Sequence, residues 1–366
     1  MKKLSFLILI LASLFTFSCG QSSEYFPIET PPETQPLVAN NIIMFIGDGM
    51  GPEHVKAASI YSYGTESGMF FQSFPVASNI TTFCADNAVT DSAAAATAIA
   101  TGHKVNYAVV SAALPGDGSE LETILEYYKA RGKSTGLVTT TYITHATPAA
   151  FGAHEPSRNN YSNIASDLLT GSKPDILFGG ASYVTPTAAA NAGYDVVTDL
   201  AQLMAINADS ATMVSGQFGS GYLPYEYDWL GTLPHLSNMV SVGLDILDKD
   251  PDGFFLMVEG GRIDHASHSN DIIRTIYETV EFENSIRVAY QWAMDHPDTL
   301  IVVTADHETG GLTVTGNNGI GNLPSVTWST TGHTATDVPV YAWGAGSAII
   351  ANVTDNTHFF NSITER

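Results

Sequence analysis

Short apolar runs rich in β-branched and aromatic residues alternate with stretches of helical periodicity from about residue 41 onward. Each run has the length of a buried strand. The runs are Ile42–Ile46, Thr135–Thr140, Asp175–Phe178, Phe254–Val258 and Leu300–Thr304. Strands that alternate with helices in this way are typical of a mostly parallel sheet with helices on both faces. The sequence therefore predicts an α/β fold of three layers.

Two of the intervening helices carry recognisable boundaries. Ser119 with Glu122 three positions later has the pattern of a capping box, which predicts a helix that begins there and ends before Gly132. A longer helix is predicted from about Asp271 to Met294, where apolar residues recur at helical spacing. Core packing is a sufficient explanation for that apolar stripe.

The first forty residues are unlike the rest of the chain. Lys2 and Lys3 precede an almost wholly apolar stretch at 5–17, and small residues surround Cys19, which is typical of an export signal. We interpret 1–18 as the signal peptide, 19–40 as a Pro-rich flexible tether and 41–366 as a single catalytic domain. Cys19 is a candidate for lipid attachment, with a plain cleaved signal as the alternative. The expected location is the periplasm or an outer-membrane anchor.

The charge balance is strongly acidic, with 14 Lys and Arg against 37 Asp and Glu and a net charge of −23. Such a chain offers no basic surface for nucleic acid. It would also repel phosphate esters unless positive charge were concentrated locally, which bound metal ions can supply. The cysteines are two in number, Cys19 and Cys84, so no disulfide is expected in the mature domain and Cys84 is predicted to be buried.

Polar clusters follow the ends of four predicted strands. They are Gly47-Asp48-Gly49, His145-Ala146-Thr147, Glu259 and Asp306-His307. Ligands bind beyond the carboxyl ends of the strands in open parallel sheets, so these clusters are predicted to converge on one site. The alternative is that they are separate surface turns.

The residue types in these clusters suit metal ions. Mixtures of His and carboxylates favour zinc, and sets of oxygen ligands favour magnesium. Asp264 and His268 are four positions apart, which one turn of helix would place on the same face. Asp306-His307 and the loop residue His333 supply further ligand types. Each of these patterns is weak evidence by itself.

Ser92 begins an alanine-rich segment that is predicted to be helical and to stop near Gly102. A serine at the start of a helix is most often only a cap. The functional alternative is that the free amides and dipole of the helix start bind a phosphoryl group, while a metal activates the hydroxyl as a nucleophile.

Taken in order, these motifs resemble the successive signatures of the alkaline phosphatases. The motifs are Gly47-Asp48-Gly49-Met50-Gly51, Asp91-Ser92-Ala93-Ala94, His145-Ala146-Thr147-Pro148-Ala149, Glu259-Gly260 through His268, Thr304-Ala305-Asp306-His307-Glu308-Thr309-Gly310-Gly311 and Gly332-His333-Thr334. The similarity extends from about Asn41 to Gly346. It implies an alkaline-phosphatase-like three-layer sandwich and a compact bacterial member of the family.

The resemblance implies two Zn²⁺ and one Mg²⁺ per chain, held by His, Asp, Glu and Thr side chains. The implied ligands are Asp264, His268 and His333 for the first zinc, Asp48, Asp306 and His307 for the second, and Asp48, Thr147 and Glu259 for the magnesium. By the same resemblance Ser92 is the nucleophile, and Arg158 is the arginine that grips the phosphate through its planar fork. The implied reaction hydrolyses phosphate monoesters with broad specificity through a phosphoserine.

Two positions depart from the pattern of the enteric bacterial enzymes. His145 stands where those enzymes have an aspartate, and His265 where they have a lysine, as in animal and some other bacterial members. We therefore expect His145 to reach the third metal only through water, and the third site to be weak and easily exchanged.

Other functions remain as alternatives. A phosphodiesterase or a sulfatase would share the paired-metal frame, but Ser92 with Arg158 favours monoesters. A non-catalytic phosphate- or metal-binding lipoprotein would lack a ligand or the nucleophile, and none is missing. Members of the family are often homodimers, so a homodimer is a further expectation.

Overall fold

The computed structural model describes residues 38–364. The predicted signal peptide, Cys19 and nearly all of the predicted tether therefore lie outside the described residues. Within 38–364, no helix combines the length and the apolar character needed to cross a membrane.

The described residues build a nine-stranded sheet with the order β2-β13-β8-β1-β7-β3-β4-β6-β5. Its strands are β1 (Asn41–Ile46), β2 (Val76–Ile80), β3 (Ser134–Tyr142), β4 (Ile176–Gly180), β5 (Asp195–Val197), β6 (Val214–Gln217), β7 (Phe254–Glu259), β8 (Thr299–Thr304) and β13 (Val338–Gly344). Neighbouring strands run parallel except that β13 is antiparallel to both β8 and β2. The five strands predicted from sequence are all present, and the mostly parallel sheet is confirmed.

Two small antiparallel pairs lie outside the main sheet. They are formed by β10 (Leu312–Gly316) with β11 (Ser325–Trp328), and by β9 (Glu308–Thr309) with β12 (His333–Thr334). The second pair matters for function because it brings His333 beside the chain that leaves β8.

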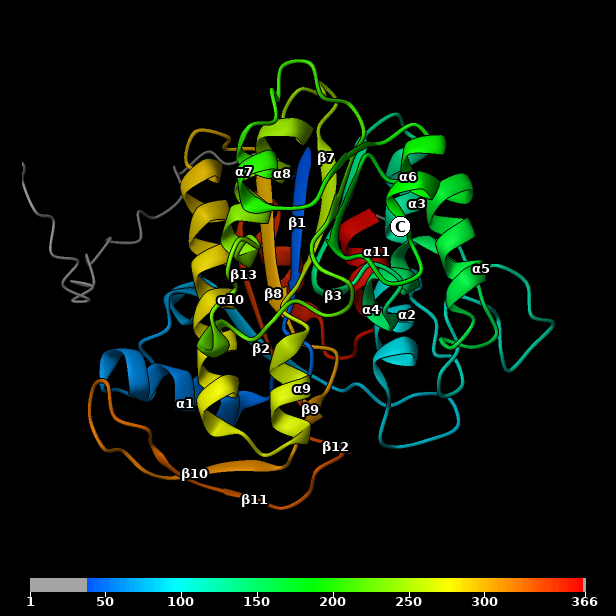
Figure 1. Cartoon of the computed structure of the whole chain (residues 1–366). Helices are drawn as coiled ribbons and strands as arrows, with labels where there is room; N and C mark the ends of the chain where they lie inside the picture. The colour runs from blue at the N-terminus through cyan, green and yellow to red at the C-terminus, as the bar shows by residue number, and fades with distance from the viewer. Residues whose placement is uncertain (1–37, 365–366) are drawn as a thin grey trace, which may run out of the picture. The chain divides into compact units, whose positions relative to one another are not determined.

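The helices form two layers on the sheet (Figure 1). One layer contains α8 and α10, with α1 and α9 packed on α10, and the other contains α2, α3, α4 and α11. The helices are α1 (Pro52–Tyr63), α2 (Ser92–Thr101), α3 (Ile124–Lys129), α4 (Ala146–Gly152), α5 (Tyr161–Ser166), α6 (Pro186–Asn191), α7 (Leu200–Met204), α8 (Leu236–Leu247), α9 (Arg262–His268), α10 (Ile272–Ala293) and α11 (His358–Thr364), with the short turns η1 (Phe70–Ser73), η2 (Asp167–Gly171), η3 (Glu226–Asp228) and η4 (Ser347–Asn352). The predicted arrangement of helices on both faces is confirmed.

The predicted capping box at Ser119 is wrong by one helical turn. The helix begins at Ile124, and the reciprocal cap is made by Thr123 and Glu126. Residues 119–121 instead pair in extended form with 111–113, through backbone hydrogen bonds such as Leu121 N to Ser111 O (3.0 Å). This pairing uses the Leu121 amide and the Ser119 carbonyl, and that carbonyl would accept the first hydrogen bond of a helix capped at Ser119. The second predicted helix is confirmed as α10, with Asp271 as its N-cap.

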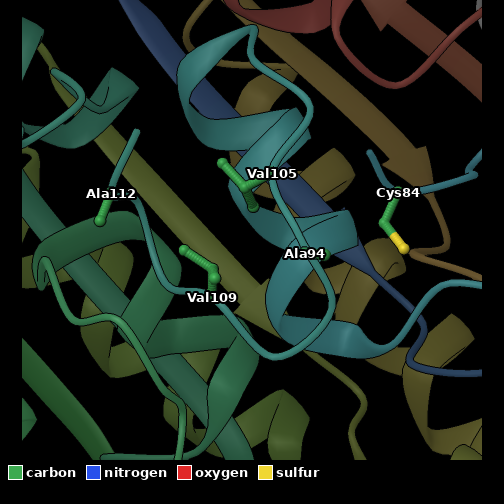
Figure 2. Packing of buried hydrophobic residues seen from close by; sticks show 5 residues of the cluster. All are labelled: Cys84, Ala94, Val105, Val109 and Ala112. Atoms are coloured by element: carbon green, nitrogen blue, oxygen red, sulfur yellow. The ribbon is translucent and has the colours of Figure 1, made fainter. Parts of the chain in front are cut away.

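A small buried cluster lies beside α2 and fixes the loop that follows it (Figure 2). It contains Cys84, Ala94, Val105, Val109 and Ala112. The Cys84 side chain is 3% exposed and the residue is unpaired, which confirms the predicted burial. The cluster is apolar and close-packed, so the start of α2 is held on a fixed base.

Candidate metal and phosphate site

Four neighbouring strands carry the predicted site residues at their carboxyl ends. In the sheet these strands lie in the order β8, β1, β7, β3. Ile46 at the end of β1 pairs with Glu259 of β7 and with Thr304 of β8, so the three strands end at one level. Asp48 follows β1, His145 follows β3, and Asp306 and His307 follow β8. The structure thus brings together clusters that the sequence separates by more than two hundred positions.

The first ligand group contains Asp264 and His268 of α9 and His333 of β12. His268 Nε2 lies 3.3 Å from one Asp264 oxygen, and His333 Nε2 lies 3.6 Å from the other. Each histidine uses Nδ1 to donate to a carbonyl oxygen, of Thr331 (2.6 Å) and of Thr90 (2.8 Å) respectively. A ring whose proton is on Nδ1 presents the lone pair of Nε2, and the two Nε2 atoms lie 3.2 Å apart. The hydrogen bond to Asp264 raises the pKa of His268 to about 9, so either a proton or a metal ion can be shared between the two rings. The carbonyl partners set the ring orientation as in protein zinc sites.

The second group contains Asp48, Asp306 and His307, all fully buried. His307 Nε2 lies 3.4 Å from an oxygen of each carboxylate. Within the described chain, both oxygens of Asp48 and one of Asp306 make no hydrogen bond of normal geometry. Burial, with repulsion from neighbouring carboxylates, raises the pKa of Asp48 well above its usual range and that of Asp306 to about 7. Buried acidic oxygens without donors are the arrangement that a divalent cation stabilises.

The third group shares Asp48 with the second and adds His145 and Glu259, with ligand atoms within 4.8 Å of one another. One Glu259 oxygen accepts hydrogen bonds from Thr139 and from Thr141 (3.0 Å). Among the described residues its other oxygen, His145 Nδ1 and the hydroxyl of Thr147 are buried without a hydrogen bond of normal geometry. These oxygen-rich donors suit a hard cation such as magnesium.

Ser92 is the first residue of α2, and it is not the helix cap. The cap is Asp91, whose Oδ1 accepts hydrogen bonds from the backbone N–H groups of Ala94 (3.2 Å) and Ala108 (2.9 Å). The Ser92 hydroxyl is therefore free of the capping role that the sequence suggested as its commoner function. It lies 3.3 Å from Nε2 of His307, beside the second ligand group.

Arg158 is held beside Ser92 by the other oxygen of Asp91. Its Nη1 donates to Asp91 Oδ2 at 2.9 Å, and its Nη2 donates to Nε2 of His145 at 3.3 Å. A guanidinium has five N–H donors, so both terminal nitrogens keep an N–H for a further acceptor. The burial of His145 and the positive charge of Arg158 lower the pKa of His145 well below its usual range. The ring is therefore neutral in this setting.

His265 lies next to His145 and belongs to none of the three ligand groups. Its Nδ1 accepts a hydrogen bond from Arg262 (2.6 Å), and its ring meets His145 edge-on at 5.6 Å between centroids. Burial lowers the pKa of His265 to about 4. The sequence placed this residue in the surroundings of the third metal, and its contact with His145 is consistent with that position.

The comparison with known proteins agrees with this geometry. The family model described as alkaline phosphatase matches residues 39–180 and 180–327. The chain belongs to the alkaline phosphatase family. It is therefore a phosphatase, and membership supports the hydrolysis of phosphate monoesters.

Individual family members match over most of their length. Alkaline phosphatase 3 of Bacillus subtilis (strain 168) is 34% identical, with 88% of each chain covered. The cold-active alkaline phosphatase of the psychrophile Shewanella sp. is 32% identical, covers 89% of this chain and 99% of its own, and has a TM-score of 0.80. A histidine-to-aspartate variant of the TAB5 alkaline phosphatase, with Mg bound in its M3 site, is 28% identical, covers 91% and 98%, and has a TM-score of 0.80.

Two histidines outside the three ligand groups have partners within the protein. His54 is buried, accepts from Gly51 N (3.2 Å) and contacts the hydroxyl of Ser267 (3.0 Å). His154 is bound to Glu126 (2.8 Å) and to the carbonyl of Ser111 (2.8 Å), contacts that hold the loop before Arg158.

A fourth group of possible metal ligands was not predicted, and it differs from the other three. His235, Glu226 and Glu281 have ligand atoms within 4.8 Å of one another. His235 Nδ1 bonds to Glu226 at 2.7 Å, and Glu281 accepts from Ser237 N (2.9 Å) and Asn284 (3.0 Å). The protein itself supplies the hydrogen bonds here, so nothing in the group calls for an ion.

Asp91 is the functional residue that sequence reasoning left without a role. In the sequence it stands out only as the residue before Ser92 in the motif Asp91-Ser92-Ala93-Ala94. Aspartate is among the preferred N-cap residues, so its place just before an alanine-rich helix could have identified the cap. Its second contact, with Arg158, depends on a residue 67 positions away and has no local signature.

Proposed function

We propose that this enzyme hydrolyses phosphate monoesters through a phosphoserine formed on Ser92, with broad specificity for the alcohol. The observation that carries the proposal is the position of the Ser92 hydroxyl. It lies 3.3 Å from Nε2 of His307 in the second ligand group, and Arg158 binds Asp91, the residue that precedes Ser92 and caps the same helix. The proposed nucleophile Ser92, the phosphate-binding Arg158 and the second ligand group therefore belong to one site.

The start of α2 supplies the anion-binding part of this arrangement. Ser92 opens a ten-residue helix whose first-turn amides and dipole favour a negative group. Because Asp91 occupies one of those amides as the cap, the serine hydroxyl itself is left to react. In the proposed first step the Ser92 oxygen bonds to phosphorus and the bond from phosphorus to the alcohol breaks. Water then hydrolyses the phosphoserine and releases phosphate.

Arg158 positions the phosphoryl group for this attack. Its guanidinium donates hydrogen bonds to Asp91 and to His145. These two bonds fix the orientation of the remaining N–H groups. A planar fork of this kind binds two oxygens of a phosphate. A monoester dianion has enough free oxygens for both Arg158 and the cations, which favours monoesters over diesters.

The ligand groups fit two zinc ions and one magnesium ion. We assign the first zinc to Asp264, His268 and His333, the second to Asp48, Asp306 and His307, and the magnesium to Asp48, Thr147 and Glu259. The support is the set of facing Nε2 atoms and buried oxygens without normal hydrogen bonds described above. When bound, such ions lower the pKa of a coordinated hydroxyl and stabilise charge on the phosphoryl group and the departing alcohol.

The tautomer of His145 supports the prediction that this residue reaches the third metal through water. Its Nε2 faces an arginine N–H, which can only donate, so the proton of the neutral ring belongs on Nδ1. Nδ1 is the nitrogen that faces Glu259, at 4.0 Å. A protonated nitrogen is no ligand, so we propose a weak, exchangeable third site. Magnesium retained at one ion per chain through prolonged dialysis would contradict this.

The test compares the wild type with Ser92→Ala in the presence of zinc and magnesium. Substrates are an aryl phosphate monoester, the matching diester and an aryl sulfate. We expect turnover of the monoester alone, lost with a chelator and restored by zinc, and a fall of at least about a thousandfold in Ser92→Ala. Ser269→Ala is the matched control, because Ser269 is exposed at the end of α9 beside the ligands and carries no site atom.

Acid quenching during turnover, followed by mass spectrometry of the peptide that contains Ser92, tests the intermediate directly. A phosphorylated peptide in the wild type is expected. If Ser92→Ala hydrolyses the monoester at the wild-type rate, the assignment of Ser92 as the nucleophile is refuted. Export with lipid attachment at Cys19, and assembly as a homodimer, stay predictions from the sequence.

A further inference from the structure

A wall of aromatic side chains continues from the phosphate site along the same edge of the sheet. Tyr142 ends β3, Tyr183 lies in the loop after β4, and Tyr222 lies in the loop after β6. These strands are consecutive neighbours beyond β7 in the sheet. The wall therefore begins where the catalytic strands end, and Tyr161 at the start of α5 completes it.

Ring contacts link the wall to the site without a gap. His145, which touches Arg158, has its ring 5.3 Å from that of Tyr142 and 6.0 Å from that of Tyr222. Tyr222 also lies against His265 at 4.4 Å, and His265 is adjacent to the ligand Asp264. The wall thus borders His145, which contacts Arg158, and His265, which precedes the α9 residues of the first ligand group in the chain.

The outer part of the wall is flat and accessible. Tyr161 and Tyr183 are stacked, with centroids 4.5 Å apart and planes 18° apart. Tyr183 is 52% exposed and Tyr222 is 43% exposed. Core packing explains Tyr142, which is 8% exposed, but it does not explain two large aromatic side chains held half in solvent beside a catalytic site.

The two loops that carry the exposed rings are fixed in place. Ser182 donates to the carbonyl of Ser220 (3.0 Å), and Leu223 N donates to the carbonyl of Thr140 (3.0 Å). Tyr183 has φ of +65°, a backbone conformation that a bulky residue rarely adopts and that costs free energy. The fold accepts that cost and holds the ring in this position.

A hollow of about 250 Å³ adjoins the stacked pair. It is lined by Tyr161, Tyr183, Ser162, Asn159, Asn160 and Asn163. The hollow begins at the residue that follows Arg158. It therefore combines aromatic faces with hydrogen-bonding groups, at a short distance along the chain from the phosphate grip.

We propose that this tyrosine wall recognises the alcohol part of the substrate and favours phosphate monoesters that carry a flat heteroaromatic ring, such as nucleoside 5′-phosphates. Bases stack on aromatic side chains with little dependence on their identity, because each base has a π face. Ser162 and Asn163 in the adjoining hollow are of residue types that can hydrogen-bond to the polar edges of the ring. The inference rests on the proposed function, and it adds a preference to an enzyme otherwise expected to be indifferent to the alcohol.

The test compares adenosine 5′-monophosphate with ribose 5-phosphate, which have the same primary leaving alcohol and differ by the base. The readout is the ratio of kcat/KM for the two substrates in the metal-loaded enzyme. We expect the wild type to prefer the nucleotide by about fivefold or more. Tyr183→Ser and Tyr222→Ser should each lower this ratio toward one, and Tyr222→Phe should keep it because stacking needs the ring and not the hydroxyl.

Tyr227→Ser is the matched control. Tyr227 is 49% exposed, but its ring packs on Tyr277 and has no contact with the wall residues. The control should keep the wild-type ratio. A wild-type ratio near one, or a fall in both substrates together in the Tyr183 and Tyr222 variants, would overturn the inference. Failure of the wild type to hydrolyse either substrate would instead refute the proposed function.

Discussion

Asp91 joins α2, which carries the proposed nucleophile Ser92, to Arg158, the proposed phosphate-binding arginine, and its two contacts can be separated by substitution. One carboxylate oxygen accepts hydrogen bonds from the first turn of α2 and from the loop amide of Ala108. The other accepts a hydrogen bond from Arg158. Asparagine is as good an N-cap as aspartate but carries no charge. Asp91→Asn therefore removes the ion pair and keeps the cap, whereas Asp91→Ala removes both.

The magnitudes follow from burial. Asp91 is 1% exposed and the Arg158 side chain is 21% exposed, so this pair is buried on one side and partly solvated on the other. Breaking a fully buried pair costs about 3–5 kcal/mol, and the partial solvation of Arg158 reduces this to about 1–2 kcal/mol for Asp91→Asn. Asp91→Ala also loses the cap on the Ala94 amide, worth about 1 kcal/mol, and leaves the Ala108 amide without its acceptor at a further cost of about 1 kcal/mol, for about 3–4 kcal/mol in total.

Two assays give the two roles different signatures. In urea unfolding at fixed zinc and magnesium concentrations, the wild type should have the highest free energy of unfolding, Asp91→Asn a lower one and Asp91→Ala the lowest. The difference between the two variants should be clear. Competitive inhibition by phosphate should weaken by about five- to tenfold in both, because Arg158 loses its anchor in both. Equal stability of the Asn and Ala variants would show that capping contributes nothing. Unchanged phosphate inhibition would show that Arg158 keeps its position without Asp91.

Two further predictions concern the frame of the site. Burial alone would lower the pKa of His154, but its bond to Glu126 outweighs burial and raises it to about 9. This stabilisation is complete below about pH 6.5 and lost as pH rises through about 9. Unfolding free energy should therefore fall by about 1–2 kcal/mol from pH 7 to 10, after allowance for solvent screening, and His154→Gln should lack this fall. Gly49 and Gly64 both have φ of +72°, but an added Cβ would meet the backbone of Asp264 at 2.9 Å in the first case and a flexible side chain in the second. Gly49→Ala should cost at least about 2 kcal/mol more than Gly64→Ala in urea unfolding, and equal costs would refute the close approach.

The sheet and the ligand groups could be predicted because their information is local. Each central strand is a short apolar run, and its ligands stand within a few residues of its end, as Asp48 does after β1. The parallel arrangement then brings the strand ends together without any further specification. The same reasoning placed α10, whose N-cap Asp271 is read directly from the sequence.

The errors and omissions have the opposite cause, since they depend on contacts between distant residues. Ser119 with Glu122 and Thr123 with Glu126 satisfy the same local capping rule. The choice between them is made by backbone pairing of 119–121 with 111–113, which no local rule contains. The tyrosine wall is likewise assembled from the end of β3, the start of α5 and two loops, and none of its members lies in a motif with a known spacing.

The placement of hydrogen bonds separates the candidate site from the other ligand-like cluster. In the other cluster, protein groups supply hydrogen bonds to His235, Glu226 and Glu281. Their proximity therefore does not require a bound ion. In the candidate site, the described residues leave both oxygens of Asp48 and one of Asp306 buried without normal hydrogen bonds. Burying such atoms costs free energy that folding alone does not recover. In a chain of net charge −23, the proposed cations would offset this cost and let a phosphate dianion approach the site.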